Sequence, residues 1–172
     1  MISRFKRNDG YLMVEIFVAI CISLVVMSTV SIMLDESISL IEQTDSKIEL
    51  MEQFSEMRGT IKRELRNSYN FRFYKRGNSI KLGDEFIEID RMKFSRFDDV
   101  KNGVSKIKER DLYINESKKK IFMRYNGGNY EIGNYAVGME AKQESENCYS
   151  IKLKLNKSNS QFSDIINIRL RN

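Results

Sequence analysis

The stretch Lys6–Leu34, KRNDGYLMVEIFVAICISLVVMSTVSIML, decides the fold. Its last 19 residues, Ile16 to Leu34, contain no charged side chain. About 20 apolar residues are enough for a helix to cross the hydrocarbon core of a bilayer, so the stretch predicts a transmembrane helix. The basic residues Arg4, Lys6 and Arg7 precede it. Because such clusters stay in the cytoplasm, we expect the N-terminus inside and the rest of the chain outside.

A secretory signal peptide is the competing interpretation of this N-terminus. Its apolar core is shorter, about 7–15 residues, and a small-x-small cleavage site follows it. Here the apolar run continues into Met33-Leu34-Asp35-Glu36, which offers no such site. The sequence therefore favours a membrane anchor that is retained.

The helix is expected to continue well beyond the membrane. The chain has no proline, and no cluster of turn residues interrupts the segment from Asp35 to Asn67. Apolar residues recur there at helical spacing, which predicts one buried face; they are Ile38, Ile41, Ile48, Met51, Phe54, Ile61 and Leu65. We predict one helix from Tyr11 to Asn67, with a membrane half and an amphipathic half.

From Tyr69 onward the apolar pattern changes to alternation, which indicates β-strands. Asn126-Gly127-Gly128-Asn129 between two such runs predicts a hairpin. CYSIKLKLN and DIINIRLRN predict a second antiparallel pair, joined by a loop over Lys157–Ser163. An antiparallel sheet with one apolar face needs a cover, and the amphipathic half-helix supplies it.

The predicted fold class is therefore α+β: a long N-terminal helix packed on a C-terminal antiparallel β-sheet. The expected division of the chain is a leader (1–10), a transmembrane helix (11–34), an amphipathic helical extension (35–67) and an extracytoplasmic β domain (68–172).

Glu15 is an ionisable group near the start of the membrane segment, and it needs a partner. A charge at the centre of a bilayer costs about 2.5–3.5 kcal/mol on insertion scales, and less near the ends of the span. If the chain were cut after Gly10, a new ammonium would appear on Tyr11, four residues before Glu15. Residues at this spacing share a helical face, so the pair would neutralise each other within one chain or between chains.

These residues resemble the leader of type IV pilins and pseudopilins: a basic segment, Gly, an aromatic residue, three apolar residues, Glu and an apolar helix. The resemblance implies that a prepilin peptidase cuts between Gly10 and Tyr11 and that Tyr11 is N-methylated. It also implies that Glu15 sets the register of the subunit in a filament. The end of the helix, with its Glu64-Leu65 pair, resembles the corresponding segment in minor pseudopilins of the J/W type and of the competence F type.

Two absences favour a minor pilin or pseudopilin over a major pilin. The membrane segment has no helix-breaking Pro, and the β domain lacks the two cysteines that close a disulfide loop in many pilins. Tyr11 stands where Phe is usual, a change that keeps an apolar helix start. The implied partners are prepilin peptidase, other pilins or pseudopilins, an inner-membrane assembly platform and membrane lipid. The implied location is the cytoplasmic membrane and then an extracytoplasmic filament.

Composition excludes several chemical functions. The chain has no histidine, so it has neither a Ser-His nor a Cys-His catalytic pair nor a histidine metal site. Its two cysteines, Cys21 and Cys148, lie in the membrane segment and the β domain, and no disulfide between them is expected. We therefore expect a structural protein without catalytic residues, metal or other cofactor.

Two further features leave alternatives open. Lys152, Lys154, Arg169 and Arg171 would form a basic surface if their strands pair, either as a contact for DNA phosphates or simply as a solvated face. The hydroxyls of Ser23, Ser28, Thr29 and Ser31 mark either close helix packing or bonds to their own helix. The alternative to a pilin as a whole is a single-span membrane protein with an unrelated extracytoplasmic sensor or binding domain.

Overall fold

The computed structural model describes residues 9–98 and 106–170. The chain divides into two compact units, Met1–Thr44 and Asp45–Asn172. The first contains most of one long helix, and the second contains the end of that helix and all the strands.

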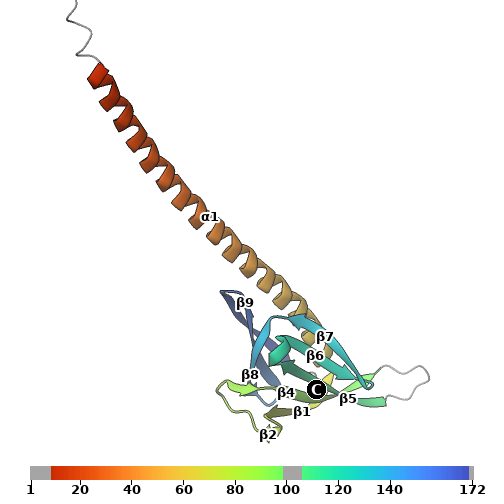
Figure 1. Cartoon of the computed structure of the whole chain (residues 1–172). Helices are drawn as coiled ribbons and strands as arrows, with labels where there is room; N and C mark the ends of the chain where they lie inside the picture. Colours follow the sequence, from red (N-terminus) through yellow and green to blue (C-terminus); the bar gives the residue numbers. More distant parts are fainter. Residues whose placement is uncertain (1–8, 99–105, 171–172) are drawn as a thin grey trace, which may run out of the picture. The chain divides into compact units, whose positions relative to one another are not determined.

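Helix α1 extends from Asp9 to Leu65, 57 residues, and confirms the prediction of one long uninterrupted helix (Figure 1). Lys62 and Arg63 lie in its last turn, where cations interact favourably with the helix dipole. The helix ends two residues before the predicted Asn67. Beyond that end, the Ser68 hydroxyl donates to the Glu64 carbonyl at 2.7 Å and satisfies one of the last free carbonyls.

The strands of the second unit form two antiparallel sheets, where the sequence predicted one. The six-stranded sheet has the order β2-β1-β4-β5-β6-β7, and the four-stranded sheet has the order β10-β9-β8-β3. A short 3-10 helix, η1 (Glu116–Lys118), joins β5 to β6. The strand bounds are β1 Ser68–Lys75, β2 Asn78–Ile80, β3 Ile87–Ile89, β4 Arg91–Asp98, β5 Lys106–Asn115, β6 Lys120–Tyr125, β7 Gly128–Asn134, β8 Ala136–Ser145, β9 Cys148–Lys157 and β10 Ser160–Arg169. The α+β class is confirmed.

Both predicted hairpins are present. Asn126 (φ 51°) and Gly127 (φ 78°) turn β6 into β7, and two positive φ angles are what a two-residue hairpin turn requires. Strands β9 and β10 pair without a break from Lys157↔Ser160 to Cys148↔Arg169. The predicted loop over Lys157–Ser163 is therefore too long, because the strand resumes immediately after a turn at Ser158 and Asn159.

Side chains of the helix end and of both sheets form one core. The helix contributes a stripe at spacings of three and four residues, here called the buried stripe: Leu50, Phe54, Met57, Ile61 and Leu65. The predicted stripe is correct at Phe54, Ile61 and Leu65. It is wrong at Ile38, Ile41, Ile48 and Met51, which are all exposed.

Close contacts attach the buried stripe to both sheets. Phe54 meets Phe162 of β10 edge to face, with ring centroids 5.4 Å apart. Met57 lies against Gly133 of β7, where an added Cβ would come within 2.5 Å of the Met57 side chain. Gly133 therefore allows helix and strand to approach, and a larger residue there would displace Met57.

A charged cluster joins the helix end to the six-stranded sheet. Glu64 accepts hydrogen bonds from Arg96 of β4, at 2.6 Å, and from Arg110 of β5. The Arg110 guanidinium also lies 4.9 Å from the centre of the Tyr125 ring. Because Glu64 and Arg110 are largely buried, removing one partner would leave a buried charge uncompensated.

We expect Ile61→Ala to lower the free energy of unfolding by about 2–5 kcal/mol, because it leaves a cavity in the core. Ile41→Ala is the matched control: the same substitution at an exposed site of the same helix should change it by less than about 0.5 kcal/mol. The chain has no Trp, so urea unfolding in detergent micelles is followed by tyrosine fluorescence and circular dichroism. Equal costs for the two variants would contradict the assigned stripe.

Candidate functional site

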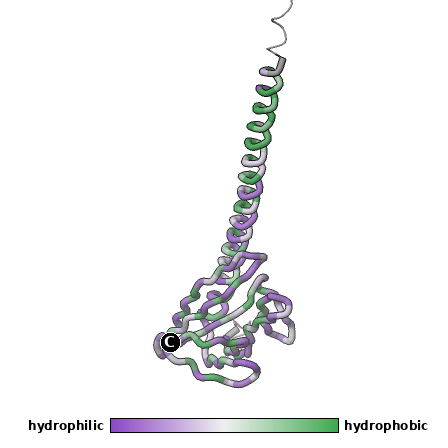
Figure 2. Tube along the Cα trace, turned by 60° about the vertical axis from the view of Figure 1, so that its left-hand side comes forward, coloured by the Kyte–Doolittle hydropathy of each residue, from purple (hydrophilic) through white to green (hydrophobic). Residues whose placement is uncertain are grey.

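The exposed surface of α1 is the most unusual feature of the chain. Every side chain from Tyr11 to Asp45 is exposed. Among the described residues, α1 is the one helix long and apolar enough to cross a membrane. Figure 2 shows hydrophobic residues concentrated along the N-terminal part of the helix and polar ones mixed into its later part. Such a surface needs lipid or other apolar partners to keep it from water.

The residues predicted for processing and register lie at the start of this helix. Gly10 and Tyr11 are both helical, and Tyr11 is 83% exposed. Glu15 follows one turn later and is also exposed. Within the described residues, no cation lies within ion-pair distance of Glu15. The predicted leader cations Arg4, Lys6 and Arg7 lie outside the described residues.

The hydroxyl side chains of the membrane segment bond to their own helix. Ser23 donates to the Ala19 carbonyl at 2.8 Å, and Ser31 donates to the Met27 carbonyl at 2.9 Å. Ser28 and Thr29 likewise donate to carbonyls three residues back. This is one of the two alternatives from the sequence. It leaves the helix surface without free donors, and small residues there still permit close approach of another helix.

Apolar exposure continues past the predicted membrane segment. Ile38, Leu40, Ile41, Ile48 and Met51 are between 49% and 63% exposed. Fully burying one such side chain contributes about 1.5–3 kcal/mol. Bilayer hydrocarbon reaches only about 20 helical residues, so a span over the predicted membrane segment would leave most of this stretch outside the hydrocarbon.

A polar cluster marks the turn of α1 where burial begins. Glu49 accepts hydrogen bonds from the Tyr135 hydroxyl, at 2.6 Å, and from the Lys157 ammonium. The hydrogen bond from Lys157, and next that from Tyr135, lower the pKa of Glu49. The same bond raises the pKa of Lys157. Nothing in the sequence pointed to this cluster, because its members are separated by 86 and 108 residues.

The predicted basic surface includes a carboxylate that pairs with two of its lysines. Lys152 and Lys154 lie on one face of β9, and both pair with Glu140 of β8; the Lys152–Glu140 distance is 3.8 Å. Arg169 is exposed near the end of β10, opposite Cys148. Arg171 lies outside the described residues. The structure thus brings the two lysines together as predicted, but around the carboxylate of Glu140, which the sequence did not predict to be there.

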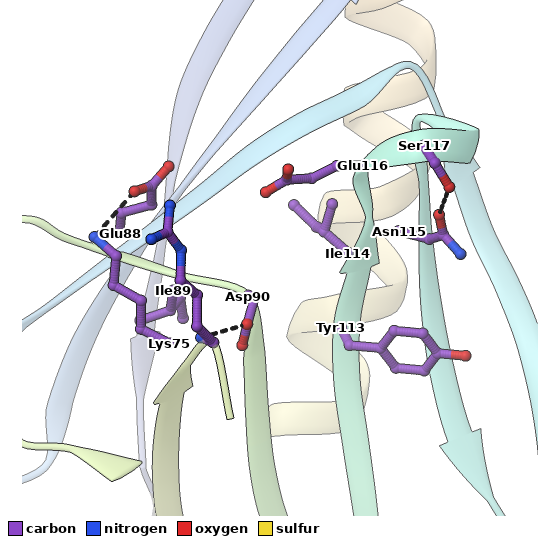
Figure 3. Close-up of a pocket in the computed structure, with 10 residues that line it drawn as sticks. Lys75, Glu88, Ile89, Asp90, Tyr113, Ile114, Asn115, Glu116 and Ser117 are labelled. Carbon is purple, nitrogen blue, oxygen red and sulfur yellow. Dashed lines mark hydrogen bonds and ion pairs between the residues drawn. The ribbon is translucent and has the colours of Figure 1, made fainter. Parts of the chain in front are cut away.

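A hollow of about 550 Å³ in the β domain lies beside η1 (Figure 3). Several groups around it are already partnered. Lys75 pairs with Glu88 at 3.0 Å, and Asp90 accepts from the Arg76 amide at 2.6 Å. Its lining combines both charges, and no group of three metal-ligating side chains occurs among the described residues. The hollow offers no recognisable catalytic arrangement.

No family model, curated protein or solved structure gives a match to this chain.

Acid should weaken the attachment of Glu49 to the β domain. Because the folded-state pKa of Glu49 is lowered, its stabilisation is present above about pH 4.5 and is lost as pH falls through the lowered pKa. We therefore expect Glu49→Gln to be less stable than the natural chain at neutral pH, with the difference shrinking in acid.

Urea unfolding between about pH 7 and about pH 3 measures this difference. Glu52→Gln, a nearby exposed carboxylate, is the control and should follow the natural pH profile. A constant difference between Glu49→Gln and the natural chain at all pH values would exclude the ionised pair as its cause.

Proposed function

We propose that this chain is a minor type IV pilin or pseudopilin, a structural subunit rather than a catalyst. The observation that carries the proposal is the long helix with a carboxylate, Glu15, near the start of its apolar segment, and with every side chain from Tyr11 to Asp45 exposed. Such a helix is buried in lipid while the subunit waits in the membrane, and is buried among other helices once the subunit has entered the filament.

In this proposal the chain is made with a short cytoplasmic leader and a C-terminal domain outside the cytoplasmic membrane. A prepilin peptidase removes residues 1–10, and the new Tyr11 amine is methylated. The segment 11–34 then leaves the bilayer and joins the helical core of a pilus or pseudopilus that serves DNA uptake, protein secretion or adhesion.

Glu15 would set the axial register of that assembly. Its carboxylate has no cation within reach in the described chain, and a neighbouring subunit's Tyr11 amine would supply one. In surroundings of low dielectric constant this pairing discriminates strongly, since any other register leaves an uncompensated charge. The subunit would therefore enter the filament at one height.

The exposed apolar residues beyond the span support assembly over simple anchoring. A single-span protein gains nothing from keeping Ile41, Ile48 and Met51 in water. In a filament these side chains would lie against neighbouring subunits and add to the burial that offsets extraction from the lipid.

Processing is tested by mass spectrometry of the N-terminus in cells with and without prepilin peptidase. We expect the mature chain to begin at N-methylated Tyr11 only where the peptidase is present. A leader that persists in both strains would overturn the proposal and leave a single-span membrane protein with a separate extracytoplasmic function.

Register is tested with Glu15→Ala. We expect the amount of this subunit in sheared filaments to fall by at least about tenfold, as the loss of one ion pair in low dielectric implies. Glu36→Ala, which removes a carboxylate at the other end of the span, is the matched control and should assemble normally. Normal incorporation of Glu15→Ala would count against the register argument.

A further inference from the structure

The outer face of the six-stranded sheet carries alternating aromatic and basic side chains. We call it the aromatic–basic face: Tyr74, Arg91, Lys93, Tyr113, Phe122 and Arg124. No single stretch of the sequence reveals this face, because its members come from four strands and meet only through the sheet register.

The register explains why these side chains share one face. Phe73, Met92, Leu112 and Met123 stand opposite one another across β1, β4, β5 and β6, and all four are buried in the core. Side chains alternate between the faces of a strand. The next row, Tyr74↔Arg91↔Tyr113↔Phe122, therefore lies on the side away from the core.

The groups of this face lie close enough to form a continuous ladder. The guanidinium carbons of Arg91 and Arg124 lie 5.7 and 5.4 Å from the centre of the Tyr113 ring. The Tyr113 and Phe122 rings stack with centroids 5.6 Å apart and planes 20° apart. At the other end, the Lys93 ammonium lies 5.6 Å from the Tyr74 ring.

The charge of the face is only partly compensated. On the same side of the sheet Arg72 pairs with Glu109, and Lys120 pairs with Glu131. Within the described residues, no carboxylate lies within ion-pair distance of Arg91, Lys93 or Arg124. Asp111 stands between Lys93 and Arg124 in the register without pairing with either. Two carboxylates, Asp90 and Asp111, therefore lie near these three cations without forming an ion pair with them, in contrast to the paired lysines of the four-stranded sheet.

A hollow of about 310 Å³ opens at the Tyr74 end of the face. Tyr74, Arg91 and Lys93 line it, together with Gly77, Asp90 and Ile114. Gly77 has φ +83° in the turn after β1, and nothing lies within 4 Å of where its Cβ would be. The hollow is therefore open on the side where Gly77 has no side chain. Figure 3 also labels Tyr113 of β5, whose ring is directed away from the Lys75–Glu88 pair.

We propose that the aromatic–basic face binds single-stranded nucleic acid. Rings with interleaved cations on an open sheet are the arrangement in which unpaired bases stack and phosphates are neutralised. Arg91, Lys93 and Arg124 contact phosphates, and a base stacks on Tyr74 at the hollow. A duplex keeps its bases paired and stacked with one another, so it uses only the cations. The proposal concerns the β domain alone and does not depend on filament assembly.

The test uses the full chain in non-ionic detergent micelles and a fluorescent oligothymidylate of about 15 nucleotides, with binding followed by anisotropy. We expect Tyr74→Ala to weaken binding by roughly fivefold or more, and Tyr74→Phe to retain it, since stacking requires the ring and not the hydroxyl. With three phosphates contacted, the logarithm of affinity should fall with the logarithm of salt with a slope of about −2.

A matched pair of double variants locates the site. Arg91→Gln with Lys93→Gln should reduce that slope to about −0.7. Lys152→Gln with Lys154→Gln removes the same charge from the four-stranded sheet and should leave affinity within about twofold.

Several outcomes would overturn the proposal. One is no anisotropy change at low salt with the natural chain. Another is that the Lys152/Lys154 variant loses binding while the Arg91/Lys93 variant keeps it. Equal competition by inorganic polyphosphate or dextran sulfate, together with no effect of Tyr74→Ala, would assign the face to polyanions in general. Unchanged near-ultraviolet circular dichroism of each variant excludes misfolding as the cause of a loss.

Discussion

The buried stripe of α1, from Leu50 to Leu65, is the contact on which the β domain depends. Two antiparallel sheets each present an apolar face, and the helix end supplies large side chains to the core that both share. Tyr149 of β9 adds a direct link between the sheets, since its ring lies 5.4 Å from Phe71 and 5.6 Å from Phe73. Without the stripe, each sheet would expose part of this core.

Two charged contacts bracket the buried stripe and fix its position along the helix. Glu49 precedes Leu50 and is held by Tyr135 and Lys157, while Glu64 precedes Leu65 and is held by Arg96 and Arg110. A shift of the helix by one turn would break both sets and leave arginines of the sheet without their carboxylate. Apolar burial is not directional, whereas these carboxylates meet their partners only in this register.

Sequence patterns predicted the long helix and several of the strands, but not which faces of these elements pack together. The absence of proline and the unbroken apolar spacing predicted the helix, and turn chemistry predicted the hairpin at Asn126. Helical spacing does not say whether a face is covered within the same chain, so Ile41 and Phe54 looked equivalent. Strands β4, β5 and β8 were not singled out, because charges such as Arg110 fall on the core side of β5 and blur the alternation.

The candidate sites also differ in how far the sequence predicts them. Gly10, Tyr11 and Glu15 are close in sequence, so one short motif was enough to predict them. The aromatic–basic face and the Glu49 cluster exist only once distant strands are in register. The acidic partner of Lys152 and Lys154 was missed for the same reason.

Most strand pairings join neighbours in sequence, and this affects how the domain folds. Strands β4 to β7 form one meander and β8 to β10 form another, so each grows by adding adjacent hairpins. Pairing strands that are adjacent in sequence closes only short loops, which costs little entropy and proceeds rapidly. There are two exceptions: β1 pairs with β4, and β3, three residues long, pairs with β8 across four intervening strands. The β3–β8 pairing forms late and has few hydrogen bonds, so it is where the folded domain is expected to open first.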